Sequence, residues 1–139
     1  MGDDRLRPLS KKGRAQAAAL PATVLGLTAG APPRLVSSPW VRCLETVAPL
    51  AERIGGEVVA DDTLGEGMGA KAVESLAGWM REDLLVLCTH GDVIESILAE
   101  LAKSGVRLRA RRQASKGSLW VLTGSGDAID AARYVPPPV

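Results

Sequence analysis

One arginine and the chain's only histidine have the chemistry needed to hold a phosphoryl group. His90 follows an apolar run at residues 84–88 and precedes Gly91, so backbone can approach a ligand closely there. Arg42 follows a Ser-Ser-Pro turn and falls in the first turn of a predicted helix, where free backbone N–H groups favour anions. A guanidinium fork and an imidazole N–H together suit phosphate oxygens. Taken singly, each also fits a structural interpretation, as a surface arginine or a satisfied, partly buried imidazole.

Helices and strands are predicted to alternate through most of the chain and to close with a hairpin. The predicted helices cover residues 11–20, 41–54, 70–81 and 92–103, and the predicted strands cover residues 34–37, 57–60, 83–89, 118–123 and 128–134. Ser10 is the expected N-cap of the first helix, Pro21 is expected to kink or break it, and Gly55-Gly56 ends the second helix. A turn at residues 124–127 joins the last two strands.

This order of elements predicts one three-layer α/β/α domain over residues 1–139, with a mostly parallel sheet and an antiparallel C-terminal edge. The strand at residues 83–89 is continuously apolar, so we expect it to be central and covered on both faces. Ligands of such sheets bind beyond the carboxyl ends of the strands. Because Ser38 and His90 both follow strand ends, Arg42 and His90 are expected to meet in space.

Two sequence motifs resemble those of the histidine phosphatase (phosphoglycerate mutase-like) superfamily. Residues 37–46 match its Ser-Ser-Pro-x-x-Arg-x-x-x-Thr motif, and residues 88–91 match its strand ending in Thr-His-Gly. Residues 6–17 resemble phosphohistidine-phosphatase-like members, and residues 116–122 resemble phosphatase domains fused behind Nudix hydrolase domains. The resemblance implies hydrolysis of phosphomonoesters or phosphohistidine through a phosphohistidine intermediate, with no cofactor and no metal.

The resemblance also implies roles for individual residues. Arg42, His90 and Ser38 would bind the phosphoryl group, while a different histidine would attack phosphorus. Glu66 lies where many members place the acid that protonates the leaving group, and Asp92 is a rival. Both carboxylates also fit an ordinary solvated loop or a helix cap.

The chain departs from the family at its first motif. The N-terminal strand ending in Arg-His-Gly, which carries the nucleophile, is absent from the sequence. We therefore expect a phosphatase-family domain with half a phosphate pocket and no turnover. Two alternative functions stay open: a degenerate phosphate-binding or interaction module, and a domain with no ligand. The missing strand would lie beside the one ending at His90, leaving an open edge. The strand at residues 118–123 could fill it, or another protomer could, giving a homo-oligomer; Met1 could also be an internal start.

Composition narrows the class of partner. The net charge of +1 argues against a nucleic-acid or membrane partner and leaves a phosphorylated small molecule or phosphoprotein. Cys43 and Cys88 give no disulfide framework, which favours a cytoplasmic setting. Five basic residues form either a solvated loop or a basic rim for a phosphorylated substrate: Arg107, Arg109, Arg111, Arg112 and Lys116. Residues 65–69 lack the spacing of a dinucleotide fingerprint.

Overall fold

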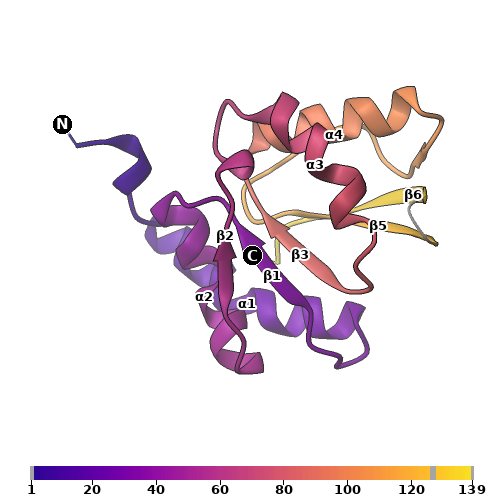
Figure 1. The fold of residues 1–139 in the computed structure, drawn as a ribbon. Helices are drawn as coiled ribbons and strands as arrows, with labels where there is room; N and C mark the ends of the chain where they lie inside the picture. Colours follow the sequence, from indigo (N-terminus) through magenta and orange to yellow (C-terminus); the bar gives the residue numbers. More distant parts are fainter. Residues whose placement is uncertain (1, 126–127, 139) are drawn as a thin grey trace.

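Two three-stranded sheets lie between helices in the computed structural model, which describes residues 2–125 and 128–138 (Figure 1). The strands are β1 (Arg34–Ser37), β2 (Val58–Ala60), β3 (Leu85–Cys88), β4 (Arg107–Leu108), β5 (Leu119–Ser125) and β6 (Ala128–Val135). The helices are α1 (Lys11–Leu27), α2 (Val41–Ile54), α3 (Gly69–Trp79) and α4 (Gly91–Lys103), with short 3-10 helices η1 (Asp4–Leu6) and η2 (Asp62–Leu64). The predicted α/β class is confirmed. Gly126 and Asp127 of the predicted turn lie outside the described residues.

The first sheet is parallel, in the order β2-β1-β3. The second has the order β4-β6-β5, and its β5–β6 pair is the predicted antiparallel hairpin. The expected single sheet is thus divided into two in the described chain. Residues 107–108, expected to lie in a loop, form β4 because they pair with Ala131 and Ala132 of β6.

The prediction that the strand at residues 83–89 is central is wrong for the described chain. β1 is central, and β3 is an edge strand whose four residues are only half-buried. The physical reason is that no described strand pairs with the edge of β3 that faces away from β1. The absence of the family's first strand from the sequence had led us to expect this open edge. β5 pairs with β6 and leaves that edge open.

Helix α1 begins and continues for identifiable reasons. The side chain of Ser10 accepts a hydrogen bond from the Gly13 N–H (3.1 Å), which confirms it as the N-cap. The helix does not break at Pro21 and runs on to Leu27. Pro21 is buried, so packing compensates for the single backbone hydrogen bond that a proline removes.

Helix α2 has the predicted bounds, and it ends where Gly55 takes the left-handed conformation (φ 66°). Two apolar clusters form the core. Leu20 and Val24 of α1 pack with Leu35 of β1 and Leu50 of α2, while α3 and α4 pack together through a second cluster around Leu76 and Ile97. The two helix pairs therefore cover opposite sides of the strand layer (Figure 1). In the described residues, no helix is long and apolar enough to cross a bilayer.

Candidate functional site

Ser38 and His90 lie together because β1 and β3 end side by side. Ser37 is paired with Cys88 in the parallel register, and the Ser38 N–H donates to the Cys88 carbonyl (2.8 Å). One residue further on, Ser38 Oγ lies 2.9 Å from His90 Nε2. Both side chains are buried. The predicted convergence of these two strand ends is therefore present.

Trp40 connects His90 with Arg42. Its backbone N–H donates to Ser38 Oγ (3.2 Å), and its indole meets the His90 ring edge-on, with ring centroids 4.7 Å apart. The Arg42 guanidinium lies over the same indole, with Cζ 4.7 Å from the ring centroid. A cation at this distance is attracted to the aromatic face, which holds the Arg42 side chain at the site.

Arg42 is engaged by acidic groups. Its side chain, 18 % exposed, lies 3.4 Å from Asp4 Oδ2 and 3.6 Å from Glu66 Oε2, and it donates to the Asp4 carbonyl (3.0 Å). Arg7 and then Arg42 lower the pKa of the Asp4 carboxyl. The structure thus brings the predicted residues Arg42 and Glu66 together. Asp4 was not anticipated, since the only sequence signal was its place in a polar N-terminal segment.

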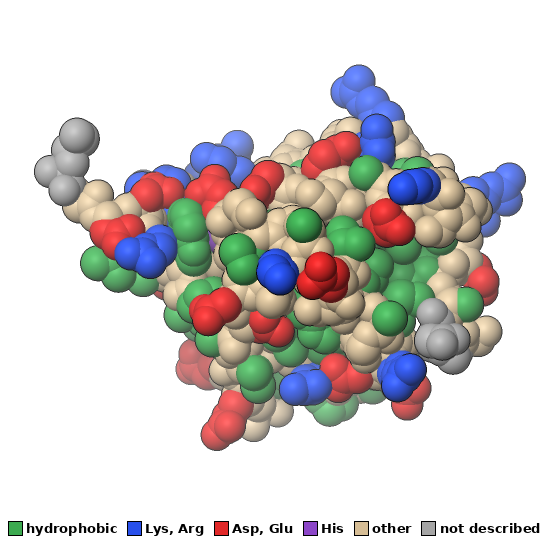
Figure 2. All heavy atoms as spheres, turned by 45° about the horizontal axis from the view of Figure 1, so that its top comes forward, with side chains coloured by type: hydrophobic (Ala, Val, Ile, Leu, Met, Phe, Trp, Pro, Cys, Tyr) green, Lys and Arg blue, Asp and Glu red, His purple; other side chains and the backbone are tan. Residues whose placement is uncertain are grey.

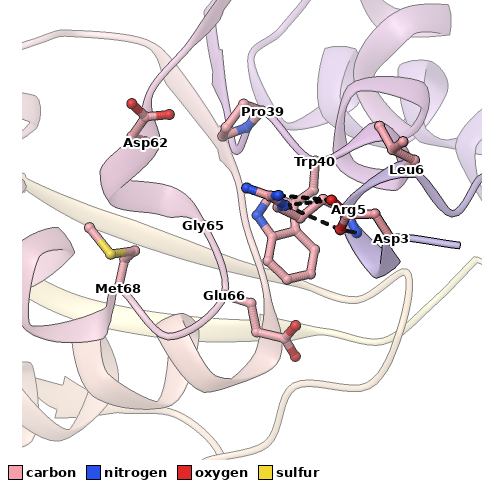
Figure 3. A pocket seen from close by; sticks show the side chains of 9 residues that line it. All are labelled: Asp3, Arg5, Leu6, Pro39, Trp40, Asp62, Gly65, Glu66 and Met68. Carbon is pink, nitrogen blue, oxygen red and sulfur yellow. Dashed lines mark hydrogen bonds and ion pairs between the residues drawn. The ribbon is translucent and has the colours of Figure 1, made fainter.

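A cavity of about 560 Å³ lies beside this cluster, between the N-terminal segment and the loop that carries Glu66 (Figure 3). Trp40 and Glu66 line it, together with Arg5 and Asp3, which form an ion pair across one wall. Ser38, Arg42 and His90 do not line it. Trp40 is the residue that the cavity and the Arg42–His90 cluster share.

Two hydrogen bonds hold the Glu66 loop in place. Thr89 Oγ1 donates to the Leu64 carbonyl (2.6 Å), and Asp92 Oδ2 accepts from the Gly67 N–H (2.8 Å). Asp92 therefore anchors the loop that carries Glu66, whereas Glu66 lies beside Arg42. The two carboxylates that the sequence left as alternative candidates for the acid thus lie in different surroundings. Of the two, only Glu66 contacts Arg42.

Sequence reasoning missed the two thiols at this site. Cys43 Sγ lies 3.6 Å from His90 Nε2, and Cys88 Sγ donates to the Cys43 carbonyl (3.5 Å); both cysteines are free. Hydrogen bonds from Cys88 and from His90 lower the pKa of the Cys43 thiol to about 5 against the opposing effect of burial. The pKa of Cys88 is raised by the same hydrogen bond and by burial. The sequence signal that could have identified them is their position, since Cys43 directly follows Arg42 and Cys88 lies two residues before His90.

The arrangement has the features of an anion site. α2 and α4 begin here, with Trp40 and His90 as their N-caps, and neither cap residue uses its side chain to bind the first turn. Their N-terminal N–H groups and dipoles favour negative charge, as does Arg42. Ala114, in the stretch between Arg109 and Lys116, lies against Gly91, so that basic segment passes the start of α4. In the described part of the chain, no three metal-ligating side chains gather.

The fold and these residues define a family. Residues 6–76, slightly more than half of the chain, match the histidine phosphatase superfamily (branch 1), and the chain belongs to that superfamily. The match includes Ser38, Arg42 and Glu66 and ends before His90. The superfamily resemblance drawn from the two motifs is confirmed.

This chain is similar to known proteins that are named as phosphatases. It is 36% identical to the 8-oxo-(d)GTP phosphatase of Mycolicibacterium smegmatis, in an alignment that covers 99% of the chain and 43% of the relative. The chain thus spans less than half the length of that relative. A mycobacterial glucosyl-3-phosphoglycerate phosphatase, solved with inorganic phosphate, is 24% identical with a TM-score of 0.49, over 74% of this chain and 73% of that one.

Proposed function

We propose that this chain supplies the phosphoryl-binding half of a histidine phosphatase site. Arg42 and His90 would hold the phosphoryl oxygens, with Ser38 orienting His90 through their 2.9 Å contact. The observation that carries the proposal is that Ser38 contacts His90 and that Trp40 contacts both His90 and Arg42, where two helices begin without side-chain caps. The ion pairs of Arg42 with Asp4 and Glu66 would open as phosphate takes their place.

Hydrolysis through this site needs a second histidine. A nucleophilic nitrogen would attack phosphorus and form a P–N bond while the P–O bond to the leaving group breaks, and water would then cleave the P–N bond. Glu66 would give a proton to the departing oxygen. The sequence contains one histidine, and the family motif that His90 matches assigns it to phosphate binding in this proposal. The chain by itself is therefore proposed to bind phosphate without turning over.

The substrate is proposed to be a phosphomonoester of a small molecule or a phosphoprotein. The relative named 8-oxo-(d)GTP phosphatase makes a purine nucleotide one candidate. In support of it, the cavity of about 560 Å³ falls within the range of small-molecule sites, and the aromatic Trp40 is among the residues that line it. The alternative function is a phosphate-dependent interaction module that binds a phosphorylated partner.

Thermal unfolding with inorganic phosphate tests the proposal. Phosphate at about a hundred times its Kd should stabilise the chain by about 2.7 kcal/mol. Arg42→Ala should abolish this shift, whereas Arg53→Ala, an exposed arginine in the last turn of the same helix, should keep it. A shift that survives Arg42→Ala would place phosphate elsewhere and reject the proposal.

An aryl phosphate assay distinguishes binding from catalysis. The chain should show no turnover above background, because a covalent nucleophile usually contributes several orders of magnitude in rate. Turnover above background would contradict the proposal that the chain binds phosphate without hydrolysing the ester. A purine nucleotide that stabilises the chain more than inorganic phosphate does would favour the nucleotide over a phosphoprotein.

A further inference from the structure

Two thiols beside the candidate site have no role in the proposed phosphate binding. Cys43 is the third residue of α2, and Cys88 is the last residue of β3. Cys88 Sγ donates to the Cys43 carbonyl (3.5 Å), and the two thiols also hydrogen-bond to each other, although 45 positions separate the residues in the chain. Both cysteines are free. The fold has therefore brought together the only two cysteines of the sequence.

The contact between the two thiols places a disulfide within reach. A disulfide holds its sulfur atoms at about 2.05 Å, so thiols in hydrogen-bond contact have to close by less than about 2 Å. The backbone of Cys88 is held by strand pairing, since Ser37 is its register partner and the Ser38 N–H donates to its carbonyl. The backbone of Cys43 is held in the first turn of α2, where its N–H donates to the Trp40 carbonyl (3.0 Å). Two well-held backbones thus keep the sulfur atoms near each other.

The two thiols differ in reactivity, because only a thiolate attacks an oxidant. Cys43 lies in the first turn of a helix and its Sγ is 3.6 Å from His90 Nε2, and both features favour a negative charge. The pKa of the Cys43 thiol is lowered to about 5, first by the hydrogen bond with Cys88 and then by His90. The same hydrogen bond and burial raise the pKa of Cys88. Cys43 is therefore the thiol that reacts first, and Cys88 is the thiol that follows.

An oxidant that reaches this pair has to be small. Cys43 is only 5% exposed, and Cys88 is half-buried at the end of β3, whose outer edge no described strand covers. Hydrogen peroxide is little larger than water and carries no charge. Figure 2 shows that the face with α3 and α4 forward carries both charge signs with hydrophobic surface between them. A mixed surface of this kind does not gather a charged oxidant, so a neutral peroxide is the class that fits.

The oxidation balances with a single peroxide molecule. The Cys43 thiolate attacks one peroxide oxygen, an S–O bond forms as the O–O bond breaks, and the released hydroxide takes a proton to become water. The Cys88 sulfur then attacks the Cys43 sulfur, an S–S bond forms as the S–O bond breaks, and the departing hydroxide leaves as water with the Cys88 proton. Both thiols are oxidised and the peroxide is reduced to water. A dithiol reductant reverses the reaction by exchange.

Oxidation would change the surroundings of His90. In the reduced chain, Cys43 Sγ and Ser38 Oγ both lie against Nε2 of this ring. A disulfide sulfur has no proton to donate and no charge, so Ser38 becomes the stronger of the two contacts. The bond would also tie the first turn of α2, which carries Arg42, to the strand end that lies two residues before His90.

We propose that Cys43 and Cys88 form a redox pair, in which a peroxide oxidises Cys43 and Cys88 then closes a disulfide beside His90. The bond locks the start of α2 to the end of β3 and removes the thiol partner of His90. This inference does not depend on phosphate binding, because neither thiol is among the proposed phosphate ligands.

Treatment of the whole chain with hydrogen peroxide, followed by blocking of the remaining thiols and peptide mass mapping, tests the proposal. The oxidised chain should lose two hydrogen atoms and yield a peptide pair joined through Cys43 and Cys88, and dithiothreitol should restore both thiols. Its thermal unfolding midpoint should rise by about 5–10 °C, because the bond constrains the unfolded chain. The ring signals of His90, the only histidine of the sequence, should shift in the NMR spectrum on oxidation and return on reduction.

Two matched variants separate the roles of the thiols. Cys88→Ala should leave Cys43 to collect oxygen as sulfenic and sulfinic acid, because no second thiol closes the disulfide. Cys43→Ala should leave Cys88 as a thiol over the same time, because burial keeps it protonated. Equal oxidation of the remaining thiol in the two variants would overturn these roles.

The unsubstituted chain decides the proposal even if a variant fails to fold. Two free thiols after peroxide treatment would overturn it, and so would a disulfide that joins two copies of the chain. Unchanged His90 signals in a chain that carries the Cys43–Cys88 bond would overturn the link to the site. Failure of the phosphate experiment would leave all of these outcomes unchanged.

Discussion

The hydroxyl oxygen of Ser38 lies 2.9 Å from Nε2 of His90, although 52 positions separate the two residues in the chain. The parallel register of β1 and β3 creates this contact, and the Trp40 N–H fixes the same hydroxyl from the other side. Ser38 is therefore the point at which the two motifs are joined. The positions of both proposed phosphate ligands, Arg42 after β1 and His90 after β3, therefore depend on Ser38.

Ser38→Ala should destabilise the chain and weaken phosphate binding. The substitution removes the acceptor of the Trp40 N–H and leaves the buried His90 Nε2 only its longer, 3.6 Å contact with Cys43 Sγ, which costs about 1–3 kcal/mol. Urea unfolding measures the loss. Ser104→Ala, at an exposed serine after α4, should change stability by less than about 0.5 kcal/mol. If the two variants were equally stable, the Ser38–His90 contact would have no energetic role.

Glu66→Gln should strengthen the binding of inorganic phosphate. The Glu66 carboxylate lies 3.6 Å from Arg42 Nη2, so it competes with an anion for the guanidinium and repels the anion. Removing one charge at about 4 Å in an aqueous setting changes the interaction by about 1 kcal/mol, or roughly fivefold in Kd.

Titration calorimetry with phosphate measures this change. Glu74→Gln is the matched control, because Glu74 is exposed on α3 and pairs only with Lys71 among the described residues. An unchanged or weaker affinity in Glu66→Gln would mean that Glu66 helps to position Arg42 instead of competing with its ligand.

The motifs predicted the proximity of Ser38 and His90 better than periodicity predicted the order of the strands. The Ser-Ser-Pro turn and the strand end at His90 placed Ser38 and His90 together because parallel strands end at one edge. The apolar character of residues 83–89 predicted a central position for β3, which is wrong. An apolar composition shows that a strand is suited to burial, but it does not show whether a neighbouring strand is present to cover it. Asp4 and Cys43 are not functional positions of either motif, because their contacts arise from the N-terminal segment lying against Arg42 and from one α2 side chain lying against His90.

Gly69→Ala should destabilise the α3–α4 packing. A methyl group on Gly69 would overlap Ser96 Oγ and lie 2.8 Å from Ser96 Cβ, so one helix must shift, at about 1–3 kcal/mol. Gly78→Ala in the same helix meets nothing within 4 Å and should stabilise the chain by about 0.5–1 kcal/mol.

Chemical unfolding of both variants and of the double variant Gly69→Ala/Ser96→Gly measures the clash. Removing the Ser96 side chain should restore part of the stability, and the cycle isolates the coupling between the two positions. Additive effects in that cycle would show that the loss in Gly69→Ala does not come from Ser96.

The stability of the chain should increase with pH through the neutral range because of Cys43. Its pKa is lowered in the folded chain to about 5, mainly by the hydrogen bond with Cys88 and then by His90, whereas an unfolded cysteine titrates near about 8.5. Between these values the unfolded chain holds a proton that the folded chain has released, so stability rises with pH. The contribution is fully present above about pH 8.5 and is lost as the pH falls through the lowered pKa.

Thermal unfolding from about pH 5 to about pH 8 measures this slope. Cys43→Ala should flatten it, since the ionising thiol is gone. Cys88→Ala removes the hydrogen bond that contributes most to the low pKa of Cys43, so the rise should move to higher pH. Cys88 itself adds no slope in this window, because its raised pKa affects stability only at higher pH. A slope that is equal in the original chain and in Cys43→Ala would assign the pH dependence to other groups and make Cys43 a neutral core thiol.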